Sequence, residues 1–521
     1  MVRHRRAGGS ILDAVHMSSQ DALWLTMDRP NNLMVIDSLM WFDTPLDVSA
    51  ARDVIQTRLV DKFPVFGARP VHLDGDWAWE PDPDYDLDRH VSVVDLPEPG
   101  GFDELRSWVG SQRSIPFDRD HPLWSVRIVN GFHPKPDCNG SALMLRSHHS
   151  LADGVRLTQV MFSLCDVVGD PASVGKTLRR STTPLGIAAS AAANLANSAL
   201  DVVTTGTRTV AKAVTAPARG AAKLTTDPAA AASELGEAVS ALGTVAVAAA
   251  RNPARLTGAA ELVSTPENRP VNDVANTAKL LLAAPSVGTV WSGTPDVAKS
   301  VGWAPDFPLA DVKRIGKATG TTVNDVLLGA VSGALTRYLR GHGDHQTDEV
   351  LWMIPVSVRP FDPDETDDLG NHFALVVLRM PLGIDDIGAR LAEIHTRMDR
   401  IKASDEALIT FSVQRLIANT PRPVAAGLTN YLANKAVGVL TNVPGPRGPI
   451  GFAGTEVAGV LGWAPCSGDQ VMTICIFSYN DRVSVGFGTD ATLVPDADRL
   501  GELFLAEFES MSRAFDASET P

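Results

Sequence analysis

Short hydrophobic runs separated by polar turns fill residues 17–168, with stretches of helical spacing between them. The runs LMVIDSLMWF (residues 33–42) and SALMLRS (residues 141–147) have the length and residue types of buried strands. Strands that alternate with helices are typical of α/β structure. We therefore predict a first α/β domain over residues 17–168.

Short hydrophobic runs again alternate with stretches of helical spacing over residues 296–515. Apolar positions at helical spacing predict a helix over residues 325–339. Continuous apolar runs predict strands over residues 351–358, 372–380 and 471–479. This pattern predicts a second α/β domain.

Residues 169–295, between these regions, have a different composition. They are rich in alanine, almost free of aromatic residues and interrupted by Pro217, Pro228 and Pro253. We predict helices here, so that a long Ala-rich helical bridge joins the two α/β domains. The longest uncharged window, residues 181–200, is mostly Ala, Ser, Thr and Asn. Because this window is too polar to span a bilayer, an integral membrane protein is not expected.

Composition and charge narrow the classes of function. Of 521 residues, 44% are hydrophobic, which is enough to bury a sizeable core. The net charge of -15 repels polynucleotides, so no nucleic-acid partner is expected. Four scattered cysteines suit free thiols in a reducing cytoplasm better than a disulfide framework or a zinc site.

The N-terminal sequence is basic, but it lacks the apolar stretch of a secretory signal. Asp13 and His16 interrupt the region in which that stretch would lie. We therefore expect no export, and Met17 is an alternative start of translation.

Two adjacent histidines, His148 and His149, end the second apolar run in the sequence RSHHSLADGV. Side chains alternate along a strand, so a two-histidine metal site would require a sharp bend, and no metal is expected. One imidazole could act as a general base if a neighbour fixes its tautomer. Asp153 could supply that contact, with Gly154 permitting a tight backbone before the next helix. The alternative is a core histidine, with Asp153 as the N-cap of that helix.

HHSLADG, residues 148–154, matches the HHxxxDG signature of CoA-dependent acyltransferases and condensation enzymes, including chloramphenicol acetyltransferase and the condensation domains of peptide synthetases. More narrowly, the chain resembles the bacterial wax ester synthase/diacylglycerol acyltransferases, particularly the actinobacterial triacylglycerol synthases. The segments that carry this closer resemblance occur in the family's order: MSSQDALWL (17–25), DRDHPLW (118–124), the segment 308–339, IPVSVRP (354–360), LGNHF (369–373), LTNVPGP (440–446) and the segment 477–496. The bridge is longer and more Ala-rich than the family pattern, and the family's usual Asn-Gly-Pro element cannot be recognised in residues 292–303.

The resemblance implies an architecture and a reaction. The fold is expected to consist of two chloramphenicol-acetyltransferase-like α/β domains with the active site in a tunnel between them. His149 is expected to deprotonate an acceptor hydroxyl, which attacks the thioester of a long-chain acyl-CoA. Acyl-CoA is a substrate here, and no cofactor is expected. An acyl-enzyme is not required, and the sequence has no GxSxG nucleophile motif.

The resemblance also implies supporting roles. Asp153 is expected to organise the base loop through a charged hydrogen bond, and His148 to pack or hydrogen-bond beside the base. Asn324, in TTVNDVLL, is expected to lie near the site, where its amide could orient the acceptor or stabilise an oxyanion. The alternative for Asn324 is an N-cap of its own helix.

Diacylglycerol is the expected acceptor, with fatty alcohols or a polyketide-type diol as alternatives within the same fold. A noncatalytic lipid-binding or droplet-coating protein is the alternative from another class. Because these acceptors are insoluble in water, we expect peripheral association with the inner face of the membrane or with lipid droplets. Residues 176–223 of the bridge carry seven basic residues against one acidic residue, which suits an interfacial segment. A helical pair packed on the enzyme's own surface is the alternative.

Overall fold

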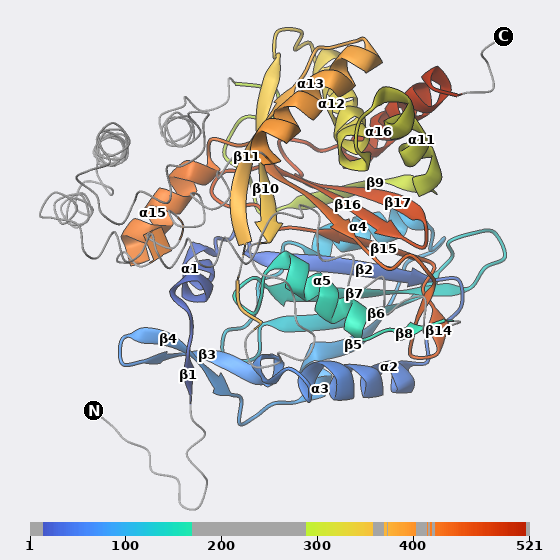
Figure 1. Cartoon of the computed structure of the whole chain (residues 1–521). Coiled ribbons are helices and arrows are strands. Elements are labelled where there is room, and N and C mark those ends of the chain that lie inside the picture. Colours follow the sequence, from blue (N-terminus) through green and yellow to red (C-terminus); the bar gives the residue numbers. More distant parts are fainter. Residues whose placement is uncertain are drawn as a thin grey trace, which may run out of the picture.

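The part of the chain described in the computed structural model begins at residue 14 and has several gaps (Figure 1). The described residues are 14–168, 288–357, 369–371, 373–402, 414, 417–418 and 422–516. The predicted Ala-rich bridge, residues 169–295, lies outside them except for its last eight residues. The remainder has mixed α/β structure, as the sequence pattern predicts.

One large sheet has the strand order β15-β2-β7-β6-β5 within the described residues. Its strands are β2 (Val35–Phe42), β5 (Val91–Asp95), β6 (Trp124–Phe132), β7 (Gly140–His148) and β15 (Gly459–Trp463). The apolar runs predicted to be strands form β2 and β7, which pair antiparallel with Val35 opposite His148. This pairing places the end of β7 beside the start of β2.

Helices cover both faces of this sheet (Figure 1). Residues 14–168 are called the first region below, and residues 288–516 the second region. The helices of the first region are α1 (Ser19–Met27), α2 (Val48–Ile55), α3 (Leu87–His90), α4 (Phe102–Gln112) and α5 (Gly154–Ser163), with a π-helical turn η1 (Gln56–Val60) and a 3-10 turn η2 (Pro64–Gly67). Residues of α2 and α5 share one core with Ile36 and Leu145. On the opposite face, Leu105 and Val109 of α4 pack against Leu39 and Met144.

The second large sheet has the order β11-β10-β12-β16-β17-β9 within the described residues. Its strands are β9 (Lys299–Pro308), β10 (Glu349–Ser357), β11 (Phe373–Pro381), β12 (Gly438–Pro444), β16 (Met472–Tyr479) and β17 (Arg482–Asp490). The three strands predicted from the apolar runs of the second region are confirmed as β10, β11 and β16.

Four helices cover one face of this second sheet: α11 (Leu309–Thr319), α12 (Val323–Gly341), α13 (Ile387–Lys402) and α16 (Ala497–Ala514). The predicted helix over residues 325–339 is confirmed as the interior of α12. Trp352 faces these helices, whereas its neighbours Leu351 and Met353 face Ala433 on the other side. Ala433 ends α15 (Arg422–Ala433).

Two small sheets complete the described residues, in the orders β1-β4-β3 and β14-β13-β8. Their strands are β1 (Val15–His16), β3 (Ala68–Leu73), β4 (Asp76–Pro81), β8 (Asp166–Val167), β13 (Ile450–Phe452) and β14 (Thr455–Glu456). The second of these sheets joins the end of the first region to the chain after β12.

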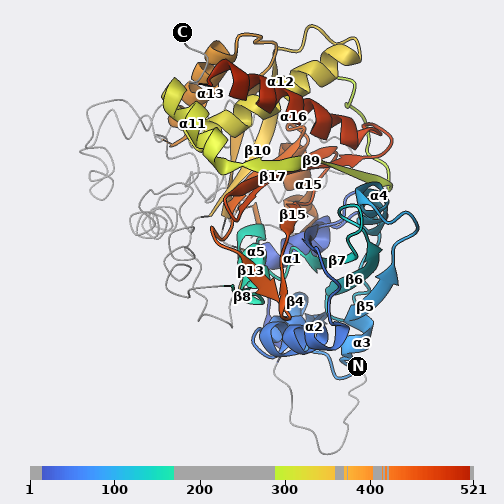
Figure 2. The same ribbon diagram turned by 90° about the vertical axis from the view of Figure 1, so that its right-hand side faces the viewer.

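The two regions are interlocked. Strand β15 comes from the second region but pairs with β2 of the first sheet, with Leu461 opposite Leu39. In Figure 2, β15 lies where the two large sheets meet. Since β15 is built into the first sheet, the predicted domain limits 17–168 and 296–515 stay predictions.

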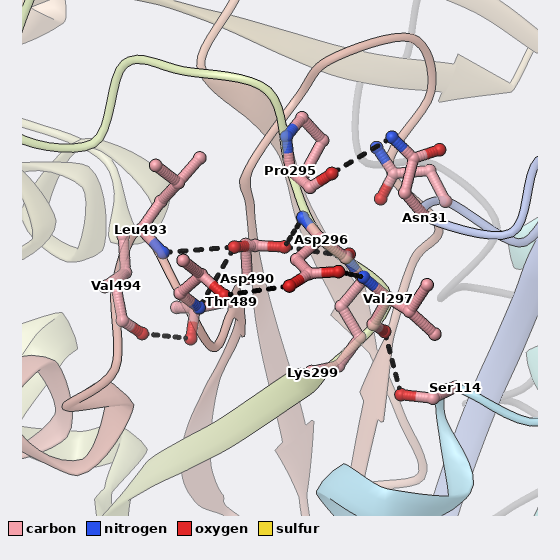
Figure 3. Close-up of polar contacts among 12 residues, drawn as sticks. Asn31, Ser114, Pro295, Asp296, Val297, Lys299, Thr489, Asp490, Leu493 and Val494 are labelled. Atoms are coloured by element: carbon pink, nitrogen blue, oxygen red, sulfur yellow. Dashed lines mark hydrogen bonds and ion pairs between the residues drawn. The ribbon is translucent and has the colours of Figure 1, made fainter.

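A polar clamp also joins the regions where the chain enters β9 (Figure 3). The Asp490 carboxylate accepts hydrogen bonds from the backbone N–H of Asp296, at 2.7 Å, and from Lys299 Nζ, at 3.0 Å. From the first region, Asn31 donates to the carbonyl of Pro295 and Ser114 donates to that of Val297. Residues 295–299 are thereby held on both regions. None of the helices in the described parts of the chain is long and apolar enough to cross a membrane.

Candidate active site

The HHSLADG loop connects the end of β7, at His148, to the start of α5, at Gly154. The N–H of His149 donates to the carbonyl of Met34 at 2.7 Å, next to the start of β2. A turn follows, in which the N–H of Leu151 donates to the carbonyl of His148. The loop is thus anchored by the two central strands of the first sheet.

The His149 imidazole lies between aromatic rings from both regions. Its ring centroid is 4.5 Å from that of Trp24 on α1 and 5.5 Å from that of Phe373 on β11. The residue is 7% exposed, and Nδ1 has no hydrogen-bond partner within the described part of the chain. Burial is the main cause that lowers the pKa of His149 to about 4; the neighbouring His148 acts in the same direction, while contacts with its own backbone and with Asn371 oppose the shift. At neutral pH this imidazole is uncharged and has a free lone pair.

His148 has a polar environment instead. The Ser150 N–H donates to His148 Nδ1 at 3.1 Å, and the Ser150 hydroxyl lies 2.8 Å from the same atom. Because Nδ1 accepts, a ring proton lies on Nε2, which is 3.8 Å from Asp28 Oδ2. Burial acts to raise the pKa of Asp28, but His148, the Met34 N–H and Arg119 together lower it. His148 therefore supports the loop through polar contacts.

Asp153 caps helix α5. Its Oδ1 accepts from the N–H of Arg156 at 2.9 Å, and its Oδ2 lies 3.6 Å from Arg156 Nε, with both side chains buried. The N-cap interpretation of Asp153 is thus observed, together with a charged contact. A Cβ added at Gly154 would meet Ile36 at 3.7 Å, an ordinary contact, so space around this position does not demand glycine.

The second region reaches the loop through residues 369–371. Asn371 Nδ2 donates to the carbonyl of His149 at 2.9 Å and to Asp21 Oδ1 on α1 at 2.6 Å. The carbonyl of Gly370 accepts from the N–H of Asp153 at 3.1 Å. Sequence reasoning assigned no role to Asn371 or Asp21, although both lie in segments, LGNHF and MSSQDALWL, that carry the family resemblance.

Asn324 is the second residue of α12 and is not its N-cap. Thr322 caps this helix, in a capping box with Asp325. The Asn324 side chain accepts a hydrogen bond from Asn442 of β12 at 3.1 Å. No hydrogen bond among the described residues joins Asn324 to the histidine loop, so its place near the reacting groups stays a prediction.

Within the described ranges, no group of three or more His, Cys, Asp or Glu side chains could hold a metal ion. The chemistry that the geometry offers is proton transfer. A neutral, buried imidazole is held by backbone contacts from one region and flanked by an aromatic ring from each.

Comparisons with known proteins agree with this geometry. Residues 17–327 match the wax ester synthase/diacylglycerol acyltransferase catalytic domain, and residues 369–512 match the C-terminal domain of the same family. A probable diacylglycerol O-acyltransferase of Mycobacterium tuberculosis is 26% identical over 437 residues, which cover 83% of this chain and 80% of the relative. An O-acyltransferase of Acinetobacter baylyi is 23% identical over 481 residues, or 89% and 90% of the two chains.

Solved structures share the fold. The wax ester synthase/diacylglycerol acyltransferase from Marinobacter aquaeolei superposes with a TM-score of 0.61 at 17% identity, covering 96% of this chain and 99% of that one. A condensation domain of the calcium-dependent antibiotic synthetase superposes with a TM-score of 0.54 at 15% identity, covering 96% of each chain. The predicted fold class, two chloramphenicol-acetyltransferase-like α/β domains, is confirmed, whereas the predicted Ala-rich bridge lies outside the described residues except for residues 288–295.

Proposed function

The chain belongs to the wax ester synthase/diacylglycerol acyltransferase family, and from this premise we propose that it esterifies diacylglycerol with a long-chain acyl group from acyl-CoA. The products are triacylglycerol and free CoA. The acyltransferase class follows from the family, and relatives named as diacylglycerol O-acyltransferases support this acceptor. The observation that carries the proposal is the neutral, buried imidazole of His149 between the two regions.

In the proposed reaction, His149 takes the proton of the acceptor hydroxyl as its oxygen attacks the thioester carbonyl. A carbon–oxygen bond forms, and the carbonyl π electrons move to the oxygen. When the tetrahedral intermediate collapses, the carbon–sulfur bond breaks and the imidazolium returns the proton to the CoA sulfur. Such a positioned base contributes about 10² to 10⁴ in rate.

A fatty alcohol is the second candidate acceptor, with a wax ester as product. The family's name and the Marinobacter structure support this alternative. A polyketide-type diol has no such support among the relatives reported above. A noncatalytic lipid-binding role is disfavoured, since HHxxxDG is intact and its second histidine is uncharged.

Attachment to a lipid surface is part of the proposal. Diacylglycerol is insoluble in water, so the enzyme must bind it at the surface of a membrane or a lipid droplet. The segment that supports it, residues 176–223, lies outside the described residues, and its net basic charge comes from the sequence alone. We place the enzyme peripherally on the inner membrane face or on lipid droplets.

The test is an assay with radiolabelled palmitoyl-CoA and either dioleoylglycerol or hexadecanol. The wild type is expected to form triacylglycerol, and His149→Ala to lose about 10² to 10⁴ of the rate while staying folded. His148→Ala should cost less, and His342→Ala, in a loop after α12, serves as the matched control. Ester formation by the His149→Ala variant above a few per cent of wild type, or no ester with either acceptor, would refute the proposal.

A further inference from the structure

Asn371 is the residue through which the second region holds the backbone of the proposed base. It precedes β11 and is 5% exposed. Its amide nitrogen bridges the His149 carbonyl and the Asp21 carboxylate, at 2.9 and 2.6 Å. One side chain of the second region thus connects helix α1 with the histidine loop.

These two acceptors fix which way the amide points. A carbonyl and a carboxylate oxygen both accept, so the NH₂ group must face them, and Oδ1 must face away. Oδ1 of Asn371 is buried without a hydrogen-bond partner within the described residues, and so is Nδ1 of His149. The two unpartnered atoms belong to groups already joined through the His149 carbonyl. A hydrogen bond between them would satisfy both.

We propose that Asn371 is the positioning residue of His149, and that its Oδ1 accepts the Nδ1 proton and so leaves the Nε2 lone pair free for the acceptor hydroxyl. This role deepens the proposed function and rests on it. The favourable contact between the Asn371 side chain and the ring, which acts to raise the pKa of His149, agrees with an acceptor at this place. Asp21 in turn holds the amide in its orientation.

The carboxylates near the loop have other partners. Asp153 accepts from the N–H of Arg156 and lies beside its guanidinium. Asp28 lies beside His148 Nε2 and Arg119, on the other histidine. A third carboxylate near the loop in the described part of the chain, Asp21, contacts the Asn371 amide. Among the described residues, the neutral Asn371 amide thus takes the place that a carboxylate has in catalytic triads, which favours an uncharged imidazole.

The test compares Asn371→Ala with Asn32→Ala. Asn32 is a matched control because it is also buried and donates from Nδ2 to two carbonyls, those of Gly468 and Gln470, at 2.9 and 3.0 Å. Both variants should lower the melting temperature. Only Asn371→Ala should lower kcat, by about 10²-fold through misplacement of the base, with KM for acyl-CoA nearly unchanged.

A reciprocal exchange, D21N/N371D, gives a second readout. It keeps one amide and one carboxylate in contact and places the negative charge beside His149, while the His149 carbonyl loses its donor. We therefore expect a lower melting temperature than in the wild type, and the pH profile is measured below that temperature. Such a charge should raise the pKa of the imidazole by about 1 unit or more. The acid limb of the kcat profile should then move to higher pH by the same amount.

An NMR titration of protein labelled with ¹⁵N-histidine measures the tautomer and pKa of His149 without turnover, with His149→Ala for assignment. We expect the Nδ1–H tautomer in the wild type, mixed tautomers in Asn371→Ala and a raised pKa in D21N/N371D. If tautomer, pKa and kcat per folded molecule stay unchanged in Asn371→Ala, the role of Asn371 is refuted, even though His149→Ala still abolishes turnover. If the wild type forms no ester, the proposed function fails and the titration alone decides on Asn371.

Discussion

At the scale of single residues, neighbouring histidines differ because their surroundings differ. His148 accepts from the backbone of Ser150 and faces Asp28, whereas His149 packs between Trp24 and Phe373. Strand alternation predicts different neighbours for two adjacent side chains. One ring is thereby suited to hold the loop and the other to exchange a proton.

The burial of His149 predicts how stability depends on pH. Its pKa is about 4 in the folded protein and about 6.5 in an unfolded chain, so below pH 6.5 the unfolded chain binds the proton first. The free energy of unfolding should therefore fall as pH drops from 6.5 towards 4, by roughly 3 kcal/mol from this residue.

Replacing the ring should remove this dependence. Between pH 7 and 4.5 we expect His149→Leu to lose roughly 2 kcal/mol less stability than the wild type, measured by urea unfolding at both pH values. His16→Leu, at an exposed histidine of β1, is the control and should follow the wild type. Parallel losses in all three proteins would contradict a buried, neutral His149.

The sequence motif predicted His149 and His148 as site residues, a prediction that the assays above test, but it gave no signal for the contact of Asn371 with the histidine loop. HHSLADG is a local sequence pattern. From it, Asp153 could be predicted both to organise the histidine loop and to cap the following helix. Asn371 is 222 residues from the carbonyl that it contacts. No periodicity or spacing relates two positions so far apart, so the contact required the folded chain.

At the scale of elements, the start of α5 combines a helix cap with a buried ion pair. Asn caps helices about as well as Asp, so Asp153→Asn should keep the cap and lose the charge beside Arg156. Removing one partner of a buried pair costs about 3 kcal/mol or more. We expect a clear fall in melting temperature together with lost activity.

Asp47→Asn is the matched control for this prediction. Asp47 caps α2 through the N–H groups of Ser49 and Ala50 but is exposed and has no ion pair in the described structure. Its replacement should change stability by a few tenths of a kcal/mol. Activity lost in Asp153→Asn without any fall in melting temperature would instead indicate a direct chemical role for Asp153.

Hydrophobic periodicity predicted β2, β7, β10, β11 and β16 closely but not the crossing strand β15. Its five residues are all buried, so they show no alternation between two faces. Gly459 lies against Trp41, and an added Cβ would approach the indole to 2.0 Å. Close packing at this crossing explains why a strand of the second region fits beside β2.

Gly459→Ala should therefore destabilise the protein by about 1 to 3 kcal/mol, since the partly buried Trp41 ring, which packs against the core, must move. Gly341, at the end of α12, has no atom within 4 Å of an added Cβ, and Gly341→Ala should be neutral or slightly stabilising. Thermal unfolding of the two variants measures the difference. Equal melting temperatures would show that β15 is not closely packed.

At the scale of the whole molecule, the site belongs to neither region alone. Trp24 and His149 come from the first, and Asn371 and Phe373 from the second. The composition and the pattern of hydrophobic runs predicted two α/β regions, and the HHxxxDG motif predicted site residues in the first of them. The interlocking through β15 and the clamp at Asp490 was not predictable, because both depend on pairings between distant segments.

The final prediction concerns lipid surfaces. Residues 176–223 carry seven basic residues and one acidic residue in a chain with a net charge of -15. Each basic residue near an anionic membrane contributes about 1 kcal/mol, and this attraction weakens as the Debye length falls from about 10 Å at 0.1 M salt to about 3 Å at 1 M. We expect the full chain to sediment with phosphatidylserine-containing liposomes at low salt and to be partly released at 1 M.

The charge itself can be tested by changing Arg208, Lys212, Arg219 and Lys223 together to glutamine. This variant should bind anionic liposomes more weakly, since four of the seven positive charges are removed, while ester formation from detergent-dispersed diacylglycerol stays at the wild-type rate. Neutral phosphatidylcholine liposomes are the control and should bind both proteins equally. If neither high salt nor the charge changes weakened binding, electrostatic attachment through this segment would be wrong, and the acceptor would have to be reached through an apolar surface instead.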